Sequence, residues 1–307
     1  MNDLNNKKSV SNSFIALEEL TLEYKKVLNS KEYKMGKRVY DYINLLRSGK
    51  VITICKRLLR RKKEDYDKII SQKEEKISNF ESYFSNKRIA VYTSVFGSYD
   101  RLLDPVIKPD NIDYYIITDQ EVDKDSKWKK VDFEDVIPSE IKDGTSKNRY
   151  VKMLPHKIFK DYDYSIYVDG NVWITSDLTP LISSLEEFPV AMHRHKNRDC
   201  VYDEIDVCIK KGKASEESLR NHQKLLEKHN VPRNLGLLEA TVIARKHFDE
   251  ECIDLMESWW KEFKENSKRD QISLIDCIWT KSINIDKIAT LGNNTFDNNK
   301  FIIFSHK

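Results

Sequence analysis

The chain has 307 residues, of which 39% are hydrophobic and 34% are charged, and its net charge at neutral pH is +3. The hydrophobic fraction suffices for one substantial core and excludes an intrinsically disordered protein. The five cysteines are scattered without a CxxC pair, which argues against a disulfide framework or a zinc ribbon and favours a reducing compartment.

The N-terminal region is expected to be helical. Apolar residues recur at helical spacing from about residue 13 to residue 85, with few glycines and no proline, which predicts two or three amphipathic helices. Residues 1–13 lack the apolar core of a signal peptide, and the chain has no run of about 18 apolar residues. We therefore expect a cytoplasmic protein that does not span a membrane.

A strongly basic segment lies within this region. Residues 31–63 contain twelve Lys or Arg and only two acidic residues. The basic residues of 49–63 alternate with apolar ones, as in an interfacial helix that faces anionic lipid at the inner face of a membrane. A solvated helix packed on its own domain explains the pattern equally well. Nucleic-acid binding is not expected, because no recognition module accompanies the charge.

From residue 87 onward the pattern becomes that of alternating strands and helices. Strands are predicted at 88–97, 112–119 and 164–168, with a helix at 148–159 before the third strand. This order indicates an α/β domain with a largely parallel sheet. In such sheets ligands bind beyond the carboxyl ends of the strands, where Gly97, Asp119 and Asp169 fall.

The C-terminal half is predicted to contain more helices than strands. The expected helices lie at 178–187, 215–229 and 249–266, with another from about 269, and the expected strands lie at 238–244 and 301–307. A polar loop rich in His and Arg is expected between the first two of these helices.

The segment Asp169-Gly170-Asn171 ends an apolar strand in a tight turn with two oxygen-bearing side chains. Such turns hold divalent cations and the phosphates that the cations carry. The spacing matches the Asp-x-Asp turn of many sugar transferases, with an amide in place of the second acid. Because the amide brings no charge, we expect weaker metal affinity. An ordinary structural turn is the competing interpretation.

Two neighbouring segments supply groups suited to a nucleotide. Gly97 follows the first domain strand and allows a close backbone approach, although the loop lacks the Gly-Lys-Ser/Thr ending of a P-loop. Arg149 and Lys152 are spaced to share one helical face. Two cations there would neutralise a diphosphate leaving group. A plain loop and a solvated helix face are the alternatives.

The C-terminal half offers candidates for the acceptor side. Asp270 opens a predicted helix, whose positive end would keep it ionised for work as a general base, with Gln271 assisting. A helix cap is the alternative role for Asp270. Glu239 is a second candidate carboxylate. His193 and His195 suggest a zinc site, but Cys200 and Cys208 lack the short ligand spacing of such sites. The two histidines are therefore expected in a polar loop that faces the substrate.

Several separate motifs, in one order, resemble the DUF616 family of glycosyltransferase-like proteins. The resemblance covers residues 87–307 and rests on Tyr92 to Asp100, Asn148 to Lys152, Tyr167 to Asn171, Arg194 to Tyr202, and the segments around Trp259 and Ser267. It implies a GT-A fold, a Rossmann-like nucleotide-sugar-binding sandwich whose C-terminal half forms the acceptor side. Residues 1–86, the N-terminal helical extension, lie outside it.

The resemblance also implies roles for individual residues. Asp169 and Asn171 would hold Mn²⁺ or Mg²⁺ on the diphosphate, and His306 would complete the metal shell. The residues expected to contact the nucleotide are Thr93, Gly97, Tyr99, Asp119, Arg149, Lys152, Asp169 and Lys307. Those expected to contact the substrate are His193, His195, Arg198, Arg269 and Gln271.

The sequence therefore predicts a glycosyltransferase that moves a hexose from a nucleoside-diphosphate sugar, UDP-linked, to a surface-polysaccharide or glycolipid acceptor. The basic helices would hold it at the inner membrane face. Two alternatives stay open. A nucleotidyl- or phosphotransferase would use the same strand ends, and a membrane-associated adaptor with a degenerate transferase domain would perform no catalysis.

Overall fold

The structure is a computed structural model that describes residues 87–306. The predicted N-terminal helices, the basic segment 31–63 and Lys307 lie outside the described residues. The described part belongs to one compact unit that begins at Lys87. None of its helices combines the length and the apolar character needed to cross a bilayer.

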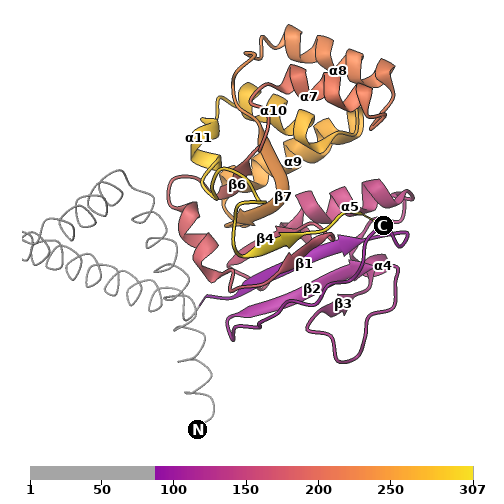
Figure 1. The fold of residues 1–307 in the computed structure, drawn as a ribbon, viewed down its shortest axis with the longest axis vertical. Helices are drawn as coiled ribbons and strands as arrows, with labels where there is room; N and C mark the ends of the chain where they lie inside the picture. Colours follow the sequence, from indigo (N-terminus) through magenta and orange to yellow (C-terminus); the bar gives the residue numbers. More distant parts are fainter. Residues whose placement is uncertain (1–86, 307) are drawn as a thin grey trace, which may run out of the picture. The chain divides into compact units, whose positions relative to one another are not determined.

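A six-stranded sheet lies at the centre of this unit, in the order β3-β2-β1-β4-β7-β6 (Figure 1). The strands β1 to β4 are mutually parallel, and β7 runs antiparallel to both of its neighbours. The strand bounds are β1 Ile89–Val95, β2 Ile112–Thr118, β3 Lys129–Val131, β4 Tyr164–Val168, β6 Val190–Arg194 and β7 Leu238–Arg245. The predicted α/β fold with a largely parallel sheet is confirmed. Strand β6 was not predicted, because its residues were assigned to a polar loop.

The central strands are largely apolar and are buried along their whole length, because both of their faces are covered. All seven residues of β1 and all five of β4 are buried. Parallel strands with helices on their faces have such continuous apolar runs, whereas a sheet with one wet face alternates. The edge strand β3 is short and largely exposed. The core thus fixes the position of the polar residues that follow β1 and β4.

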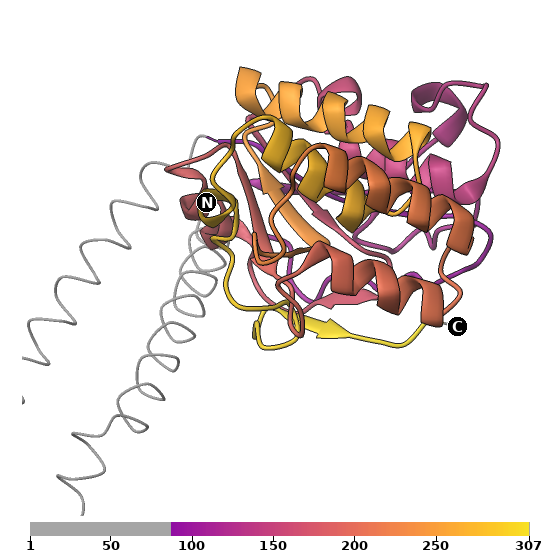
Figure 2. The same cartoon turned by 90° about the horizontal axis from the view of Figure 1, so that it is seen from above.

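The longer helices form layers beside the sheet (Figures 1 and 2). Helix α5 packs against β1 and α9, helix α10 lies against α9 and β7, and α7 and α8 pack against each other. The bounds of these helices are α5 Gly144–Met153, α7 Val201–Lys210, α8 Glu216–Lys228, α9 Glu250–Glu265 and α10 Asp270–Thr280. The short helices are α4 Phe133–Val136, α6 Pro155–Ile158, the 3₁₀ helix η1 Thr179–Leu185 and α11 Ile285–Ile288.

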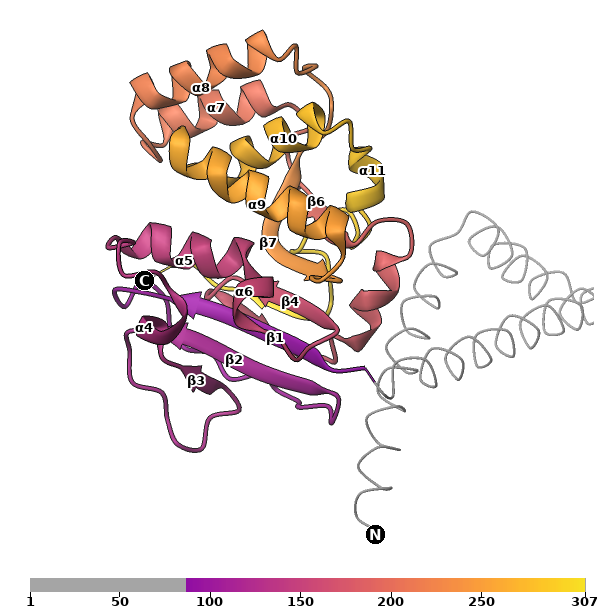
Figure 3. The same ribbon diagram turned by 180° about the vertical axis from the view of Figure 1, so that it is seen from behind.

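A second, two-stranded sheet joins the turn after β4 to the end of the chain. Strand β5 (Val172–Ile174) pairs antiparallel with β8 (Phe301–Ile303). The tail that follows β8 runs to the carboxyl ends of β1 and β4, where Figure 3 also places the C-terminus. This pairing brings His306 to the loop after β1, although the two segments are far apart in sequence.

A fully buried arginine connects three elements of the core. The guanidinium of Arg245, at the end of β7, donates to the Tyr92 hydroxyl at 2.9 Å and to the Lys152 carbonyl at 2.7 Å. Its Nε donates to the Met256 sulfur at 3.2 Å. A planar guanidinium can satisfy several acceptors in fixed directions, which an ammonium group cannot. Arg245 therefore fixes the end of α5, and with it the position of Lys152.

We predict that Arg245→Lys lowers the free energy of unfolding by about 1–3 kcal/mol, because at least one buried acceptor loses its donor. Chemical denaturation measures this loss. Arg220→Lys is the matched control, since Arg220 pairs with Asp206 on the surface and should change stability by less than about 0.5 kcal/mol. Equal losses in the two variants would contradict the structural role given to Arg245.

Candidate active site at the carboxyl edge of the sheet

The Asp169 turn lies at the carboxyl end of β4, as the sequence predicts for a ligand-binding edge. The Asp169 amide donates to the Thr241 carbonyl at 2.9 Å, and the Val172 amide closes the turn on the Asp169 carbonyl at 3.0 Å. The Asp169 carboxylate accepts hydrogen bonds from the Tyr167 hydroxyl at 2.9 Å and from Lys152 Nζ at 3.4 Å. About a quarter of its side chain (27%) is exposed. A ligand can therefore reach a carboxylate that the protein already holds in place.

Gly170 is required by space at the middle of this turn. A Cβ atom at this position would lie 2.4 Å from Val95 Cγ2 and 3.3 Å from an Asp100 carboxylate oxygen. Val95 ends the buried strand β1 and has little freedom to move. The glycine thus allows the loop after β1 to lie directly against the turn after β4.

The loop after β1 is shaped by Asp119. Gly97 has a φ of 66°, and its amide donates to both carboxylate oxygens of Asp119, at 3.1 and 2.9 Å. The exposed Tyr99 ring at the tip of the loop lies against the His306 ring, with centroids 4.6 Å apart. Asp119, which we expected to face the nucleotide, holds the loop that carries Tyr99.

The predicted cations and the predicted base meet in one buried network. Asp270 lies 3.0 Å from Lys152 Nζ and 2.9 Å from Arg149 Nε, measured to the same carboxylate oxygen. Lys152 and Asp270 are almost fully buried, whereas Arg149 keeps some exposure. Although burial alone raises the pKa of Asp270, the charges of Arg149 and Lys152 outweigh it and hold that pKa well below the ordinary range. Asp270 is therefore ionised, and its charge is compensated by Arg149 and Lys152.

Polar neighbours fix the orientation of the network. Asn148 donates through Nδ2 to the Ser94 carbonyl at 2.7 Å and to the Tyr167 hydroxyl at 3.3 Å. Its amide oxygen accepts from Arg149. Burial and the neighbouring Asp169 raise the pKa of Tyr167 well above its ordinary value, so the hydroxyl stays protonated and donates to that carboxylate. Tyr167 was not among the predicted site residues. Its spacing, two residues before Asp169, does place it on the same face of the strand.

A narrow hollow opens beside Asp169, between the ends of β1, β2 and β4. Its lining includes Thr93, Arg101, Trp128, Asp169 and Gly170. The Thr93 hydroxyl is buried without a hydrogen-bond partner, which suits contact with a ligand. The volume of about 10 Å³ holds no more than one water, so a nucleotide must bind over the mouth or displace the loop after β1.

Two arginines near this edge make no ion pair with any residue in the range 87–306. Arg101 is exposed at the hollow, and half-buried Arg269 precedes Asp270, whose pKa its charge helps to lower. A buried Nε of Arg269 also lacks a hydrogen-bond partner. Both cations remain available to an anionic ligand. Arg101 was not among the predicted site residues, because a single exposed arginine in a loop gives no sequence signal.

Two of the predicted metal ligands, Asn171 and His306, each keep one atom with a free lone pair that could bind a cation. Asn171 donates through Nδ2 to the Phe304 carbonyl at 2.8 Å, which leaves its amide oxygen for a cation. His306 uses Nδ1 against Asp100 at 2.8 Å, which leaves Nε2. These residue types suit Mn²⁺ or Mg²⁺ chemically. Within residues 87–306, however, Asp100, Asp169 and His306 do not form a group close enough to hold an ion. Phosphate oxygens or movement of the tail must complete such a site.

His193, which we predicted to lie in a polar loop facing the substrate, lies instead in strand β6. Its side chain is fully buried, where Nδ1 contacts the Thr295 hydroxyl at 3.3 Å and Nε2 contacts Asn298 at 3.1 Å. Burial lowers the pKa of His193 to about 4, so the ring is neutral at pH 7. The residue lies in β6 and holds the segment before β8.

His195 and Arg198 stabilise their own loop. His195 Nδ1 accepts from the amides of Asn197 and Arg198, at 3.3 and 3.1 Å. The Arg198 guanidinium pairs at 2.5 Å with the buried Glu204 at the start of α7. These contacts leave both side chains committed within the protein, in contrast to the substrate contacts that we expected.

Glu239 and Gln271 also bind the protein backbone. The two carboxylate oxygens of Glu239 accept from the amides of Lys196 at 3.0 Å and Thr295 at 2.9 Å. Gln271 donates to the Leu238 carbonyl at 3.3 Å. A carboxylate that connects two loops in this way is a poor candidate for the catalytic role expected of Glu239.

A larger cleft of about 1020 Å³ lies between the end of β6, the end of α10 and α11. It is lined by charged, aromatic and amide side chains. Arg194 and Asp286 form an ion pair there at 2.6 Å, and the half-buried Trp279 donates to the His229 carbonyl at 2.9 Å. Such a mixed lining suits a polar ligand with apolar faces, as sugars have. No pattern in the sequence predicted this cleft, because its lining comes from separate segments of the chain.

Comparison with known proteins identifies the family of this chain. A family model described as "TOD1/MUCI70, glycosyltransferase-like domain" matches residues 70–301. A search of curated proteins finds no match.

Among solved structures, the bifunctional glycosyltransferase WbbM, in its apo form, is similar at 13% identity and a TM-score of 0.42, over 65% of this chain and 38% of WbbM. Galactosyltransferase LgtC, solved with donor and acceptor sugar analogues, is similar at 12% identity and 0.35, over 62% of this chain and 70% of LgtC. GlyE of Streptococcus pneumoniae TIGR4 is similar at 14% identity and 0.34, over 64% of this chain and 44% of GlyE. The chain thus spans less than half the length of WbbM and of GlyE.

We predict that Asp270→Asn lowers the free energy of unfolding by about 3–5 kcal/mol, because buried Lys152 and Arg149 lose their compensating charge. Thermal and chemical denaturation measure this loss. Because the folded-state pKa of Asp270 is lowered, its contribution is complete above about pH 4, the ordinary carboxyl value, and declines as the pH falls further. The gap between the two proteins should narrow in acid.

The control for this prediction is Asp254→Asn, which removes a carboxylate that is largely exposed and pairs with Lys281 at 2.6 Å. We expect a loss of no more than about 1 kcal/mol. A stability gap for Asp270→Asn as small as that of the control, or unchanged down to pH 2, would show that the network does not carry the stability assigned to it.

Proposed function

Since the chain belongs to the TOD1/MUCI70 family of glycosyltransferase-like domains, we propose that it moves a hexose from a UDP-linked sugar to a surface-polysaccharide acceptor. The observation that carries the proposal is the meeting of Asp169, Arg149, Lys152 and Asp270 at the carboxyl edge of the sheet. Ligands of open α/β sheets bind at this edge.

Departure of a nucleoside diphosphate requires positive charge beside the phosphates, because charge accumulates there as the bond to the sugar breaks. In our proposal Arg101 and Arg269 supply it directly, since neither is paired within the described part of the chain. Arg149 and Lys152 contribute less, because Asp270 and Asp169 offset their charges. The hydroxyl of Thr93 and the ring of Tyr99 would contact the nucleotide at the hollow.

A divalent ion, when bound, would add a Lewis-acidic charge on the diphosphate. Asp169, Asn171 and His306 would hold it together with phosphate oxygens. The Lys152 ammonium lies 3.4 Å from the Asp169 carboxylate, so a cation of the protein already occupies one side of this ligand. We therefore expect weak metal affinity in the absence of the nucleotide.

We assign Asp270 to positioning and not to proton transfer. A general base works best when its pKa is near the operating pH, whereas the pKa of Asp270 is held far below that range by Arg149 and Lys152. The carboxylate instead keeps both cations at the donor side. This role differs from the base function expected from its place at a helix start.

The acceptor side of the proposal is the cleft beside Trp279. Its lining comes from the C-terminal half of the chain, on the side where we expected the acceptor. The pair of Arg194 and Asp286 offers a donor and an acceptor of hydrogen bonds for sugar hydroxyls. The basic segment 31–63 would keep the enzyme at an anionic, cytoplasmic membrane face near a lipid-linked acceptor.

The full-length protein should release UDP from a UDP-sugar and should be stabilised against heat by the matching donor. We predict that Asp169→Asn lowers turnover about 100-fold or more, because the ligand-facing carboxylate loses its charge. UDP detection and thermal shift measure the two effects. Asp161→Asn is the control, since Asp161 is exposed and precedes β4, whereas Asp169 follows the carboxyl end of that strand.

Three results would contradict the proposal. Release of pyrophosphate in place of UDP would identify a nucleotidyltransferase. A lack of stabilisation by any nucleotide sugar, with or without Mn²⁺, would identify a non-catalytic adaptor. Equal activity in Asp169→Asn and the control would remove Asp169 from the site.

We predict that Asn234→Trp, which places a large ring in the cleft, reduces sugar transfer to the acceptor at least about tenfold, while acceptor-independent UDP release stays within about twofold. Asn234 is exposed in a loop, so the fold should tolerate the change. Lys210→Trp on α7 lies outside the cleft lining and serves as the control. Equal loss of transfer and UDP release would place the acceptor elsewhere.

A further inference from the structure

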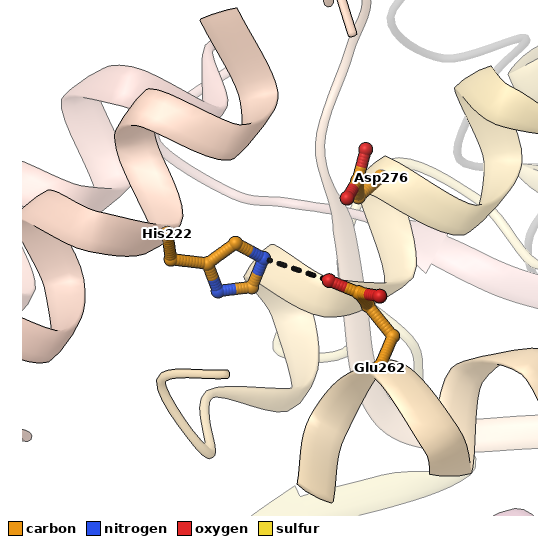
Figure 4. A group of neighbouring side chains, drawn as sticks. All are labelled: His222, Glu262 and Asp276. Atoms are coloured by element: carbon orange, nitrogen blue, oxygen red, sulfur yellow. Dashed lines mark ion pairs between the residues drawn. The ribbon is translucent and has the colours of Figure 1, made fainter. Parts of the chain in front are cut away.

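Three potential metal ligands from three helices meet inside the helical layer. His222 of α8, Glu262 of α9 and Asp276 of α10 point toward one another (Figure 4). One ligand atom from each lies within 4.8 Å of the others. Within residues 87–306 this is the one such group of His, Cys, Asp or Glu side chains. None of the three was assigned a role above.

The imidazole of His222 is oriented for a ligand at Nε2. Its Nδ1 lies 2.8 Å from the hydroxyl of Ser267, and its Nε2 is buried with no hydrogen-bond partner. The His222 side chain is fully buried, and Glu262 Oε1 lies 3.6 Å from Nε2. If Nδ1–H donates to Ser267, an Nε2 lone pair faces a carboxylate. That contact is repulsive unless a cation or a proton lies between the two atoms.

The two carboxylates of the cluster also repel each other unless a cation or a proton lies between them. Asp276 is almost fully buried and Glu262 is 20% exposed, so two like charges lie close together where little water can screen them. Each is held by its own neighbour: Asn266 donates to Glu262 Oε1, and His229 Nδ1 lies 2.8 Å from Asp276 Oδ1. Hydrogen bonds of this kind orient the ligands of known metal sites.

We propose that His222, Glu262 and Asp276 bind a divalent transition-metal ion of the Zn²⁺ type, at a site separate from the Asp169 turn. Zn²⁺ bonds of 2.0–2.2 Å place tetrahedral ligand atoms about 3.4 Å apart, close to the 3.6 Å between His222 and Glu262. The nitrogen ligand favours this class of ion over Mg²⁺ or Ca²⁺, which prefer oxygen. Water can supply a fourth ligand.

Such an ion would connect α8 and α9 to the middle of α10. Asp276 lies six residues after Asp270 on the same helix, and Ser267, which contacts His222, precedes that helix in the chain. The ion would therefore stabilise the helix that presents Asp270 to Lys152 and Arg149. Its role is structural, because its ligands lie inside the helical layer.

The test is the metal content and thermal stability of the purified full-length chain. We expect about one equivalent of Zn²⁺ per chain by elemental analysis, and a fall in melting temperature with a strong chelator. Re-addition of Zn²⁺ at a hundredfold excess over Kd should raise the melting temperature by about 5–10 °C, and Mg²⁺ should not.

Glu262→Gln should abolish the bound equivalent and the Zn²⁺-dependent shift, and its partly exposed side chain makes folding of the variant feasible. Glu257→Gln is the matched control on the same helix, since Glu257 pairs with His156 at 3.0 Å away from the cluster. The control should keep both signals. Asp276→Asn provides a second ligand variant of nearly unchanged size.

Two outcomes would overturn the proposal. If the wild-type chain binds no Zn²⁺ and its melting temperature rises with Zn²⁺ no more than that of Glu262→Gln, the cluster is a carboxyl pair that shares a proton. If Asp169→Asn removes the bound ion and Glu262→Gln does not, the ion belongs to the turn after β4. Neither readout requires sugar transfer, so the result does not depend on the proposed function.

Discussion

The buried contact between Asp270 and Lys152 is the interaction on which the arrangement of the site depends. Neither charge is tolerated away from water without a partner, so α5 and α10 must meet where the two side chains touch. Other contacts position each of the two residues: Trp259 Nε1, on α9, donates to the Asp270 carbonyl at 2.8 Å, and Arg245, on β7, donates to the Lys152 carbonyl. The packed core and the charged edge thus share the same residues. A substitution in the core should therefore disturb the charged edge, and a substitution at the edge should disturb the core.

The sequence predicted the sheet and the polar residues that follow its parallel strands. Apolar strands that end in Gly97, Asp119 and Asp169 are local patterns, and they place those residues correctly because the strands are parallel. Arg149 and Lys152 were found through helical spacing, which is also local. The partner that binds both cations was not predictable as such, because Asp270 is 118 residues from Lys152 and only the fold brings them together.

The errors concern polar residues whose surroundings are set by distant segments. His193 has the composition of a loop residue, yet it lies in β6, where the chain before β8 covers it. Glu239 looks like a free carboxylate in sequence, but the amides of Lys196 and Thr295 occupy both of its oxygens. The group of His222, Glu262 and Asp276 has no short spacing at all. Periodicity indicates which face of an element is apolar, and it says nothing about which polar atoms another element will reach.

The strand order has a consequence for how this domain folds. Strand β4 lies in the middle of the sheet, but its neighbour on one side, β7, is formed by residues about 75 positions later in the chain. Until β7 arrives, the largely apolar strand β4 presents an unpaired edge. Such non-local pairing slows folding, and exposed apolar edges recruit other chains. Strand β4, which leads into the candidate site, is therefore exposed to aggregation during synthesis and refolding, and dilute conditions or chaperones should favour its correct assembly.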